Sequence, residues 1–262
     1  MIQRIYTGSD EMILKISVSA ARKTNIRIVI KDANQANTVL TDRVAAINGK
    51  EDFFIGLPLC REYVDLVITD KSGGNSSFTY NGFIKMPLIK RMDIVDLQKN
   101  YLSSFIKFIQ KFCYNAGVLR TNNPANANDL YRSDDWRFFI RYLPVIKDER
   151  TGQEIITPAR INGNGLIEIS QKYFLPYSVP CRVGTLLHEF SHPFLNEDPD
   201  NESEADINGL LIYMGLGYPE YDAAEVWCRV FEESPSEENN ERLFIIQQFI
   251  EDFRSNKLFI KQ

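Results

Sequence analysis

Histidine is scarce in this sequence, since a chain of 262 residues contains only two, His188 and His192. Chemistry that needs an imidazole therefore has to use one or both of them. Cysteine is also sparse: the four cysteines form no Cys-x-x-Cys pair, which argues against a zinc ribbon and against a disulfide framework. This cysteine usage favours a reducing compartment.

The chain also lacks an excess of positive charge and long apolar runs. Its formal net charge is -5 and its sequence pI is about 5.3, so we expect no nucleic-acid partner. No stretch approaches the roughly 20 apolar residues that span a bilayer, and the N-terminal segment has no secretory signal pattern. We therefore expect a cytoplasmic protein without a membrane segment.

Residues 1–90 predict a small β-sandwich that serves as an attachment or binding module. Runs at 13–18, 25–30, 64–69 and 77–80 alternate β-branched with other residues, as strands do. A segment rich in glycine and asparagine at 70–75 is typical of a hairpin connection between the last two runs. We identify no catalytic or calcium-binding pattern in this part of the chain.

After about residue 90 the hydrophobic period changes to that of a helix. Apolar residues three or four apart predict one long helix, with Cys113 as a packed thiol beside them: Ile94, Leu97, Tyr101, Phe105, Ile109 and Phe112. A polar loop at 121–128 follows, and then a hairpin of 136–142 with 154–157 around a turn at 148–152. One more strand is expected at 166–170, after a turn at 162–165.

The C-terminal third predicts four helices, at about 182–192, 201–215, 219–232 and 237–255. The expected fold class is therefore α+β. An N-terminal β-sandwich (1–90) precedes a second domain (91–262), which combines a mixed sheet with a helical C-terminus.

The two histidines stand in the string His188-Glu189-Phe190-Ser191-His192. Residues four apart project from one helix face about a turn apart, so both imidazoles can reach one metal ion. Glu189 then points toward the open position of the metal, where it suits a general base acting on a metal-activated water. The apolar residues that flank the histidines favour a helix: Val183, Leu186, Leu187 and Phe190.

Zinc bound by two histidines needs a third protein ligand, and a following helix carries a candidate. Glu202 and Asp206 are four residues apart, so both can face the histidines. We expect Glu202 to bind Zn²⁺ and Asp206 to accept a hydrogen bond from the outer nitrogen of a ligating histidine. Glu204 is instead interpreted as a solvated carboxylate at a helix N-terminus.

The pair of motifs, His188-Glu189-x-x-His192 and Glu202-x-x-Ala205-Asp206, resembles those of zincin metallopeptidases of the gluzincin type. The resemblance covers about residues 165–232 and is one of motif only. It implies a zincin-like domain with His188, His192 and Glu202 as zinc ligands and Glu189 as the catalytic base. It also implies that the strand at 165–170 forms the upper rim of the cleft and binds an extended peptide by strand addition.

Three features depart from that family. The ten-residue step from His192 to Glu202 is short and requires a tight turn at 193–200. Pro193 disfavours helical geometry at the preceding residue, which places His192 at the end of its helix. No third histidine is present to stabilise an oxyanion, and spacing does not choose among five other candidates: Tyr173, Tyr177, Arg182, Tyr213 and Tyr218.

The sequence therefore predicts a zinc-dependent peptidase that acts on a peptide or protein substrate. The alternative is a structural protein, such as a component of a bacteriophage particle or another assembly, whose zinc site stiffens the domain. Assembly would then involve the N-terminal domain. A metal amidase or deformylase is the third interpretation, but Cys181 lacks the Glu-Gly-Cys context of that family.

Overall fold

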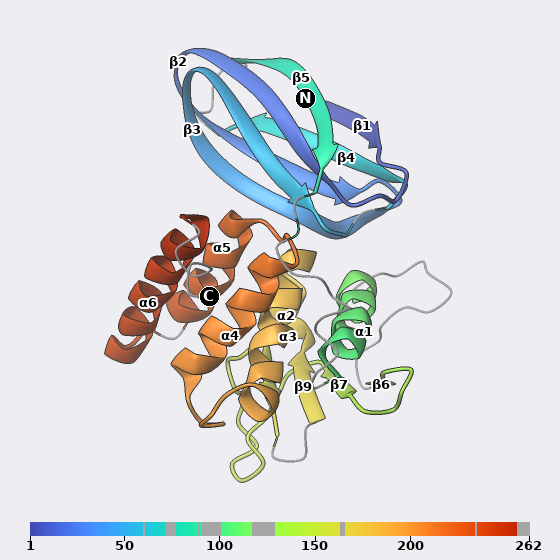
Figure 1. Cartoon of the computed structure of the whole chain (residues 1–262), viewed down its shortest axis with the longest axis vertical. Coiled ribbons are helices and arrows are strands. Elements are labelled where there is room, and N and C mark those ends of the chain that lie inside the picture. The colour runs from blue at the N-terminus through green and yellow to red at the C-terminus, as the bar shows by residue number, and fades with distance from the viewer. Residues whose placement is uncertain are drawn as a thin grey trace.

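A computed structural model describes residues 1–59, 61–71, 77–88, 90, 101–116, 129–162, 166–233 and 235–255 (Figure 1). An N-terminal sheet precedes a smaller sheet and a helical C-terminus, which confirms the expected α+β class. Several expected features lie wholly or mostly outside the described residues: the start of the first helix at 93–100, the loop at 121–128, and the turns at 70–75 and 162–165.

The N-terminal part is a five-stranded antiparallel sheet. Its strands are β1 (Ile2–Tyr6), β2 (Met12–Asp32), β3 (Gln35–Leu57), β4 (Tyr63–Asp70) and β5 (Phe78–Pro87). They are ordered β1-β4-β2-β3, and β5 pairs separately with β2. The four expected strand segments all fall within these strands, except for the first residue of the last segment, but the long strand β3 was not expected.

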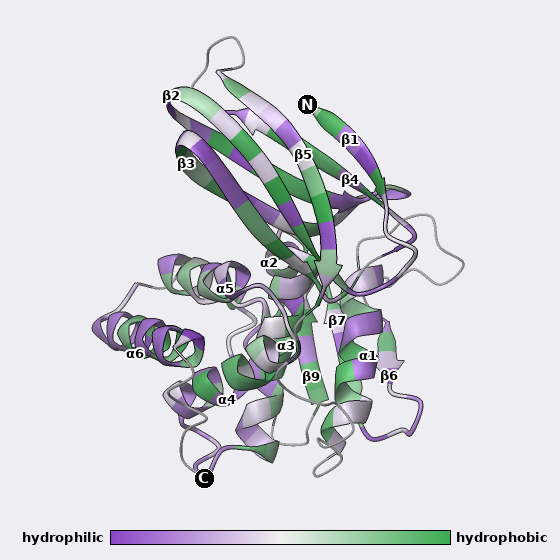
Figure 2. Cartoon of the chain, turned by 45° about the horizontal axis from the view of Figure 1, so that its top comes forward, coloured by the Kyte–Doolittle hydropathy of each residue, from purple (hydrophilic) through white to green (hydrophobic). Residues whose placement is uncertain are grey.

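Strand β2 is continuous where the sequence predicts two separate strands. Its pairing with β3 is irregular between Ala20 and Thr24, and residues 21–23 are exposed there. The same alternate positions are buried on both sides of this bend: Leu14, Ile16 and Val18 before it, and Ile26, Ile28 and Ile30 after it. Figure 2 shows hydrophobic and hydrophilic bands along β2. Strand β5 pairs with the first half of β2 and β4 with the second half. The N-terminal part is therefore one bent sheet folded over its own apolar face.

The second sheet has the order β6-β7-β9-β8, with β7 and β9 parallel and the other pairs antiparallel. Its strands are β6 (Leu130–Arg132), β7 (Phe139–Leu143), β8 (Ala159–Ile161) and β9 (Leu166–Ser170). The predicted hairpin of 136–142 with 154–157 is wrong, because β7 pairs with β6 and β9 instead. The turn at 148–152 does form. The residues on its two sides, Lys147 and Glu154, make an isolated antiparallel bridge rather than a hairpin of two strands.

Six helices complete the described part of the chain. They are α1 (Leu102–Asn115), α2 (Gln171–Phe174), α3 (Val179–Phe194), α4 (Glu202–Gly215), α5 (Glu220–Glu233) and α6 (Glu237–Arg254). The last four match the four expected helices within a few residues. Cys113 on α1 is fully buried, as expected for a packed thiol, and burial raises its pKa above the usual range. No described helix is long and apolar enough to cross a membrane.

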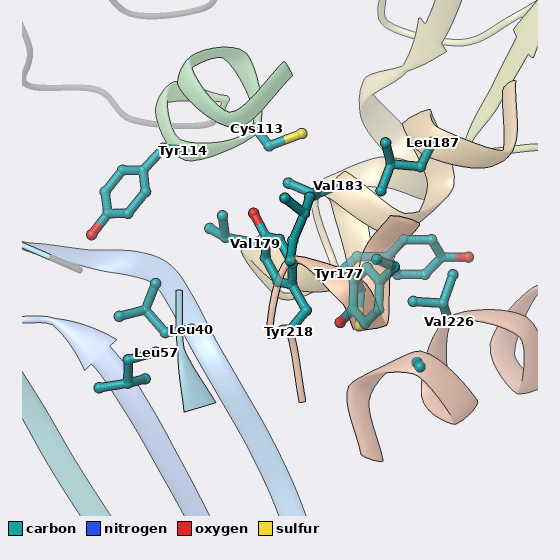
Figure 3. Close-up of a cluster of buried hydrophobic side chains, with 14 of the residues drawn as sticks. Leu40, Leu57, Cys113, Tyr114, Tyr177, Val179, Val183, Leu187, Tyr218 and Val226 are labelled. Carbon is teal, nitrogen blue, oxygen red and sulfur yellow. The ribbon is translucent and has the colours of Figure 1, made fainter. Parts of the chain in front are cut away.

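The N-terminal sheet packs against the helices through one contiguous core. Leu40 and Leu57 of β3 lie on one side of the buried cluster in Figure 3, with residues of α1 and α3 across from them. The two parts approach closely, since a Cβ added at Gly56 would lie 3.0 Å from the Gly217 carbonyl oxygen. The division into domains 1–90 and 91–262 stays a prediction.

A buried carboxyl group lies where the sheet meets helix α5. Thr41 of β3 donates a hydrogen bond to Asp222, with 3.2 Å between Oγ1 and Oδ1. Asp222 is fully buried, and burial together with the nearby carboxylate of Glu225 raises its pKa to about 8. Thr41 lowers the pKa, as does Arg43, whereas Asp42 raises it slightly. The folded chain therefore keeps a proton on Asp222 at pH values where the unfolded chain has released it.

We expect Asp222 to make the free energy of unfolding fall by about 3–4 kcal/mol as pH rises from about 5 to about 8. The sign follows because a raised folded-state pKa favours the protonated folded form, and this advantage is lost with rising pH. The substitution Asp222→Asn should remove the part of this dependence that Asp222 contributes, and denaturant unfolding at both pH values measures the difference between the variant and the wild-type chain. Asp134→Asn, at an exposed carboxylate, should leave the dependence unchanged. An unaltered pH slope in Asp222→Asn would contradict this assignment.

Candidate metal centre

Helix α3 presents both histidines on one face. The side chain of Ser178 caps the helix by accepting a hydrogen bond from the Cys181 backbone N–H, and Pro180 lies in the first turn. The expected apolar face is fully buried: Val183, Leu186, Leu187 and Phe190. The side chains of His188 and His192 remain 15% and 12% exposed. One face of the helix is thus packed in the core, and the histidines on the other face line a cleft.

The two imidazole rings converge on one point. Their planes are nearly perpendicular, at 89°, and their Nε2 atoms are 3.2 Å apart. Nδ1 of His192 lies 2.8 Å from the carbonyl oxygen of Pro199. Because a carbonyl only accepts, this Nδ1 carries the proton, which leaves the Nε2 lone pair directed at the shared point. Two ligands of a tetrahedral zinc ion lie ~3.3 Å apart, so the histidine pair fits such an ion.

The sequence predicts that Pro193 ends the helix at His192. In the structure, α3 continues two residues further, to Phe194. Proline lacks the N–H that would bond to the carbonyl of Glu189. The helix is held beyond this point by the ring of Phe194, which stacks on Phe190 with 4.6 Å between centroids. His192 is therefore fixed within the last turn rather than at a fraying end.

The segment between the two motifs turns tightly, as its length requires. Asn201 caps α4 by accepting a hydrogen bond from the backbone N–H of Glu204. The carboxylate of Glu204 accepts hydrogen bonds from the backbone N–H groups of Glu197 and Asp198, at 2.8 and 3.4 Å. Glu204 is thus a partly exposed carboxylate at a helix N-terminus, and it also orders the turn.

Glu202 joins the histidines at the start of α4. Its Oε2 lies 3.4 Å from Nε2 of His188, and its Oε1 lies 3.7 Å from Nε2 of His192. One ligand atom from each of the three residues falls within 4.8 Å of the others. Two imidazole nitrogens with one carboxylate oxygen form a donor set that zinc accepts. The geometry and the chemistry of His188, His192 and Glu202 therefore both fit a divalent metal ion.

Asp206 lies behind His188, as expected for a residue that orients a ligand. Its carboxylate is 1% exposed, and Oδ1 lies 2.9 Å from Nδ1 of His188. Trp227 of α5 donates a hydrogen bond from Nε1 to Oδ1, at 2.7 Å. Arg242 of α6 contacts both oxygens, at 2.7 Å from Nε and 3.0 Å from Nη2. Helices α3, α5 and α6 thus meet on one side chain of α4.

The charges at the site favour a cation beside the histidines. Burial lowers the pKa of His188, but Asp206 and Glu202 together raise it to about 10. The pKa of Asp206 is lowered, because His188 and Arg242 outweigh the effect of burial. The carboxylates therefore stabilise positive charge at His188, which a proton or a divalent metal can supply.

Glu189 points into the same cleft and is 8% exposed. Burial raises its pKa, whereas His188, His192 and the backbone of Ile161 act to lower it. A carboxyl group with a raised pKa beside a metal site suits a group that accepts a proton and later gives it back. The structure thus brings together all five residues that the sequence singles out.

The site lies in a cleft of about 760 Å³. The cleft is lined by β8 with its flanking residues 155, 157, 158 and 162, and by Val226, Trp227 and Phe231 of α5. The expectation that the strand at 165–170 forms the rim is wrong, because this strand, β9, lies between β7 and β8. The edge strand β8 lines the cleft instead. Sequence periodicity cannot identify an edge strand of three residues.

None of the five candidates for stabilising an oxyanion lines the cleft. Arg182 is buried and donates to the backbone carbonyls of Cys113, Ala116 and Leu175. Tyr173 donates to Glu154 on the exposed surface. The other three tyrosines are buried in the core: Tyr177, Tyr213 and Tyr218. The polar side chains that do line the cleft, besides the site residues already described, are Thr157, Arg160, Asn162, Thr185 and Asp200.

Three residues of the site were missed in the sequence: Gly209, Trp227 and Arg242. A Cβ at Gly209 would lie 2.9 Å from the His188 backbone nitrogen, so glycine is required where α4 crosses α3. Its position seven residues after Glu202 and three after Asp206, on the same helix face, was a signal for such a close contact. Trp227 and Arg242 carry no comparable signal, because their place depends on how α5 and α6 fold back.

No protein-family model, curated protein or solved structure matches this chain. The geometry of the site is therefore the basis for its interpretation.

We expect Gly209→Ala to push α4 away from α3 and to destabilise the fold by about 1–3 kcal/mol, because an added methyl group overlaps the helix backbone. The displacement should also move Glu202 and Asp206 away from the histidines and weaken metal binding. Thermal unfolding and isothermal titration with zinc measure the two effects. Wild-type stability together with wild-type zinc affinity would contradict the close contact of the two helices.

Proposed function

We propose that this chain is a zinc-dependent peptidase of the zincin type, with His188, His192 and Glu202 as zinc ligands. The observation that carries the proposal is the placement of Glu189. It lies on the helix that carries both histidines, faces the same cleft, and has a raised pKa. A site that only stiffened the fold would need no proton-accepting group at this position.

When bound, zinc would acidify a water molecule and polarise the carbonyl group of a substrate. Glu189 would take a proton from that water and pass it to the amine that leaves as the peptide bond breaks. Asp206 holds Nδ1 of His188, and the carbonyl of Pro199 holds Nδ1 of His192. Both contacts fix the ring orientations that zinc binding requires.

The shape of the cleft supports a peptide substrate. Strand β8 is the edge of its sheet and lines the cleft. An extended peptide can add to such an edge through main-chain hydrogen bonds, which would hold its scissile bond beside Glu189. The apolar side chains of α5 that line the cleft would then contact substrate side chains: Val226, Trp227 and Phe231.

The test of this function is the substitution Glu189→Gln, which removes the proton acceptor but keeps the size and polarity of the side chain. We expect zinc to remain bound, since Glu189 is not a ligand, and peptide hydrolysis to fall by at least ~10²-fold. Cleavage of a peptide library and metal analysis of the same preparation measure both quantities.

Glu197→Gln is the matched control, because Glu197 is an exposed carboxylate on the turn between the two motifs. This variant should cleave at the wild-type rate. Equal cleavage by Glu189→Gln and the wild-type chain would refute the proposed role of Glu189. Full zinc occupancy without hydrolysis of any library peptide by the wild-type chain would favour the alternative, a component of a particle or assembly with a structural zinc site.

A further inference from the structure

Helix α6 places one arginine in the metal centre. Ser236 caps the helix by accepting a hydrogen bond from the backbone N–H of Asn239, and Arg242 follows within the second turn. The guanidinium group contacts Asp206 through two nitrogens and lies 3.1 Å from Oε2 of Glu202. Its side chain is only 12% exposed. Arg242 is thus within ion-pairing distance of both Glu202 and Asp206, the two carboxylates that also contact His188.

Apart from this arginine, helix α6 is only lightly buried. Of its described side chains, Ile246 and Phe253 are the only fully buried ones. Phe244 and Ile245 are 68% and 42% exposed, so the apolar residues of the helix do not all face the core. Arg242 also lies over the ring of Phe231 on α5, 4.9 Å from its centroid. In the N-terminal half of α6, the contacts of Arg242 therefore act together with the packing of Leu243 against the core.

The carboxylates of Glu202 and Asp206 are stabilised by a fixed cation beside the histidines. They are four residues apart on one helix face, where like charges repel, and Asp206 is almost completely buried. A planar guanidinium group can bind both carboxylates at once and fixes their orientation. Without it, Asp206 would keep only His188 and Trp227 of the partners described above, and Glu202 would lose the ion pair at its Oε2.

We propose that Arg242 is a positioning residue that couples the docking of helix α6 to the assembly of the metal centre. This inference rests on the proposed zinc site. If docked α6 favours the arrangement of Glu202 and Asp206 that binds zinc, then zinc must in turn favour docked α6, because coupling between two equilibria is reciprocal. Zinc binding should therefore stabilise a helix that contributes no ligand.

Hydrogen exchange of the full chain with and without zinc tests this coupling. In the wild-type chain we expect zinc to slow exchange of the backbone amides in α6 by at least ~10-fold, together with those of α3 and α4. In Arg242→Gln, zinc should protect α3 and α4 but add no protection to α6. Arg242→Lys keeps the charge but loses the planar guanidinium group, so zinc should protect α6 in this variant to an intermediate extent. The Lys variant keeps the test interpretable if Arg242→Gln folds poorly.

Arg254→Gln is the matched control on the same helix. Arg254 pairs with Glu220 of α5, 3.1 Å away, and does not contact the metal centre. Its removal should leave the zinc-dependent protection of α6 at the wild-type level. The proposal is overturned if zinc protects α6 equally in Arg242→Gln and in the wild-type chain, or if a wild-type chain that binds zinc shows no added protection there. A wild-type chain that binds no zinc would overturn the proposed metal site itself. This result differs from a failure of the coupling, in which the wild-type chain binds zinc but α6 gains no protection.

Discussion

The arrangement of the C-terminal helices depends on the buried carboxylate of Asp206. A charge removed from water is costly unless it is paired and hydrogen bonded, and Asp206 is 1% exposed. Its partners come from three other helices: His188 of α3, Trp227 of α5 and Arg242 of α6. These helices cannot separate without leaving the carboxylate unpaired, so the same interaction that completes the fold also orients a histidine.

The rest of the chain supports this centre from two sides. Helices α3 and α4 cross so closely that only a glycine fits at position 209, which sets the distance from Glu202 to the histidines. The bent N-terminal sheet packs against the other end of the helices, where Gly56 approaches Gly217. The second sheet contributes its edge strand, β8, to the cleft. The helices and the edge strand thus line the site, and the N-terminal sheet supports the helices from outside the cleft.

The features that were predictable from the sequence are local ones. His188, Glu189 and His192, and likewise Glu202 and Asp206, are placed by the geometry of a single helix, so their spacing was enough. Trp227 and Arg242 reach the site only through the packing of α5 and α6, which leaves no local pattern. The same limit applies to strands. Alternation identifies a strand, but it did not show that two runs form one bent β2, or that β7 pairs with β9 rather than in a hairpin.

The central claim is that His188, His192 and Glu202 form a metal centre, and elemental analysis of the purified full-length chain after dialysis tests it most directly. The proposed metal site predicts about one zinc ion per chain in the wild type, and a much lower content in His188→Ala, which removes one of the three ligands. A wild-type chain without stoichiometric zinc, or a His188→Ala variant that retains all of it, would contradict the claim.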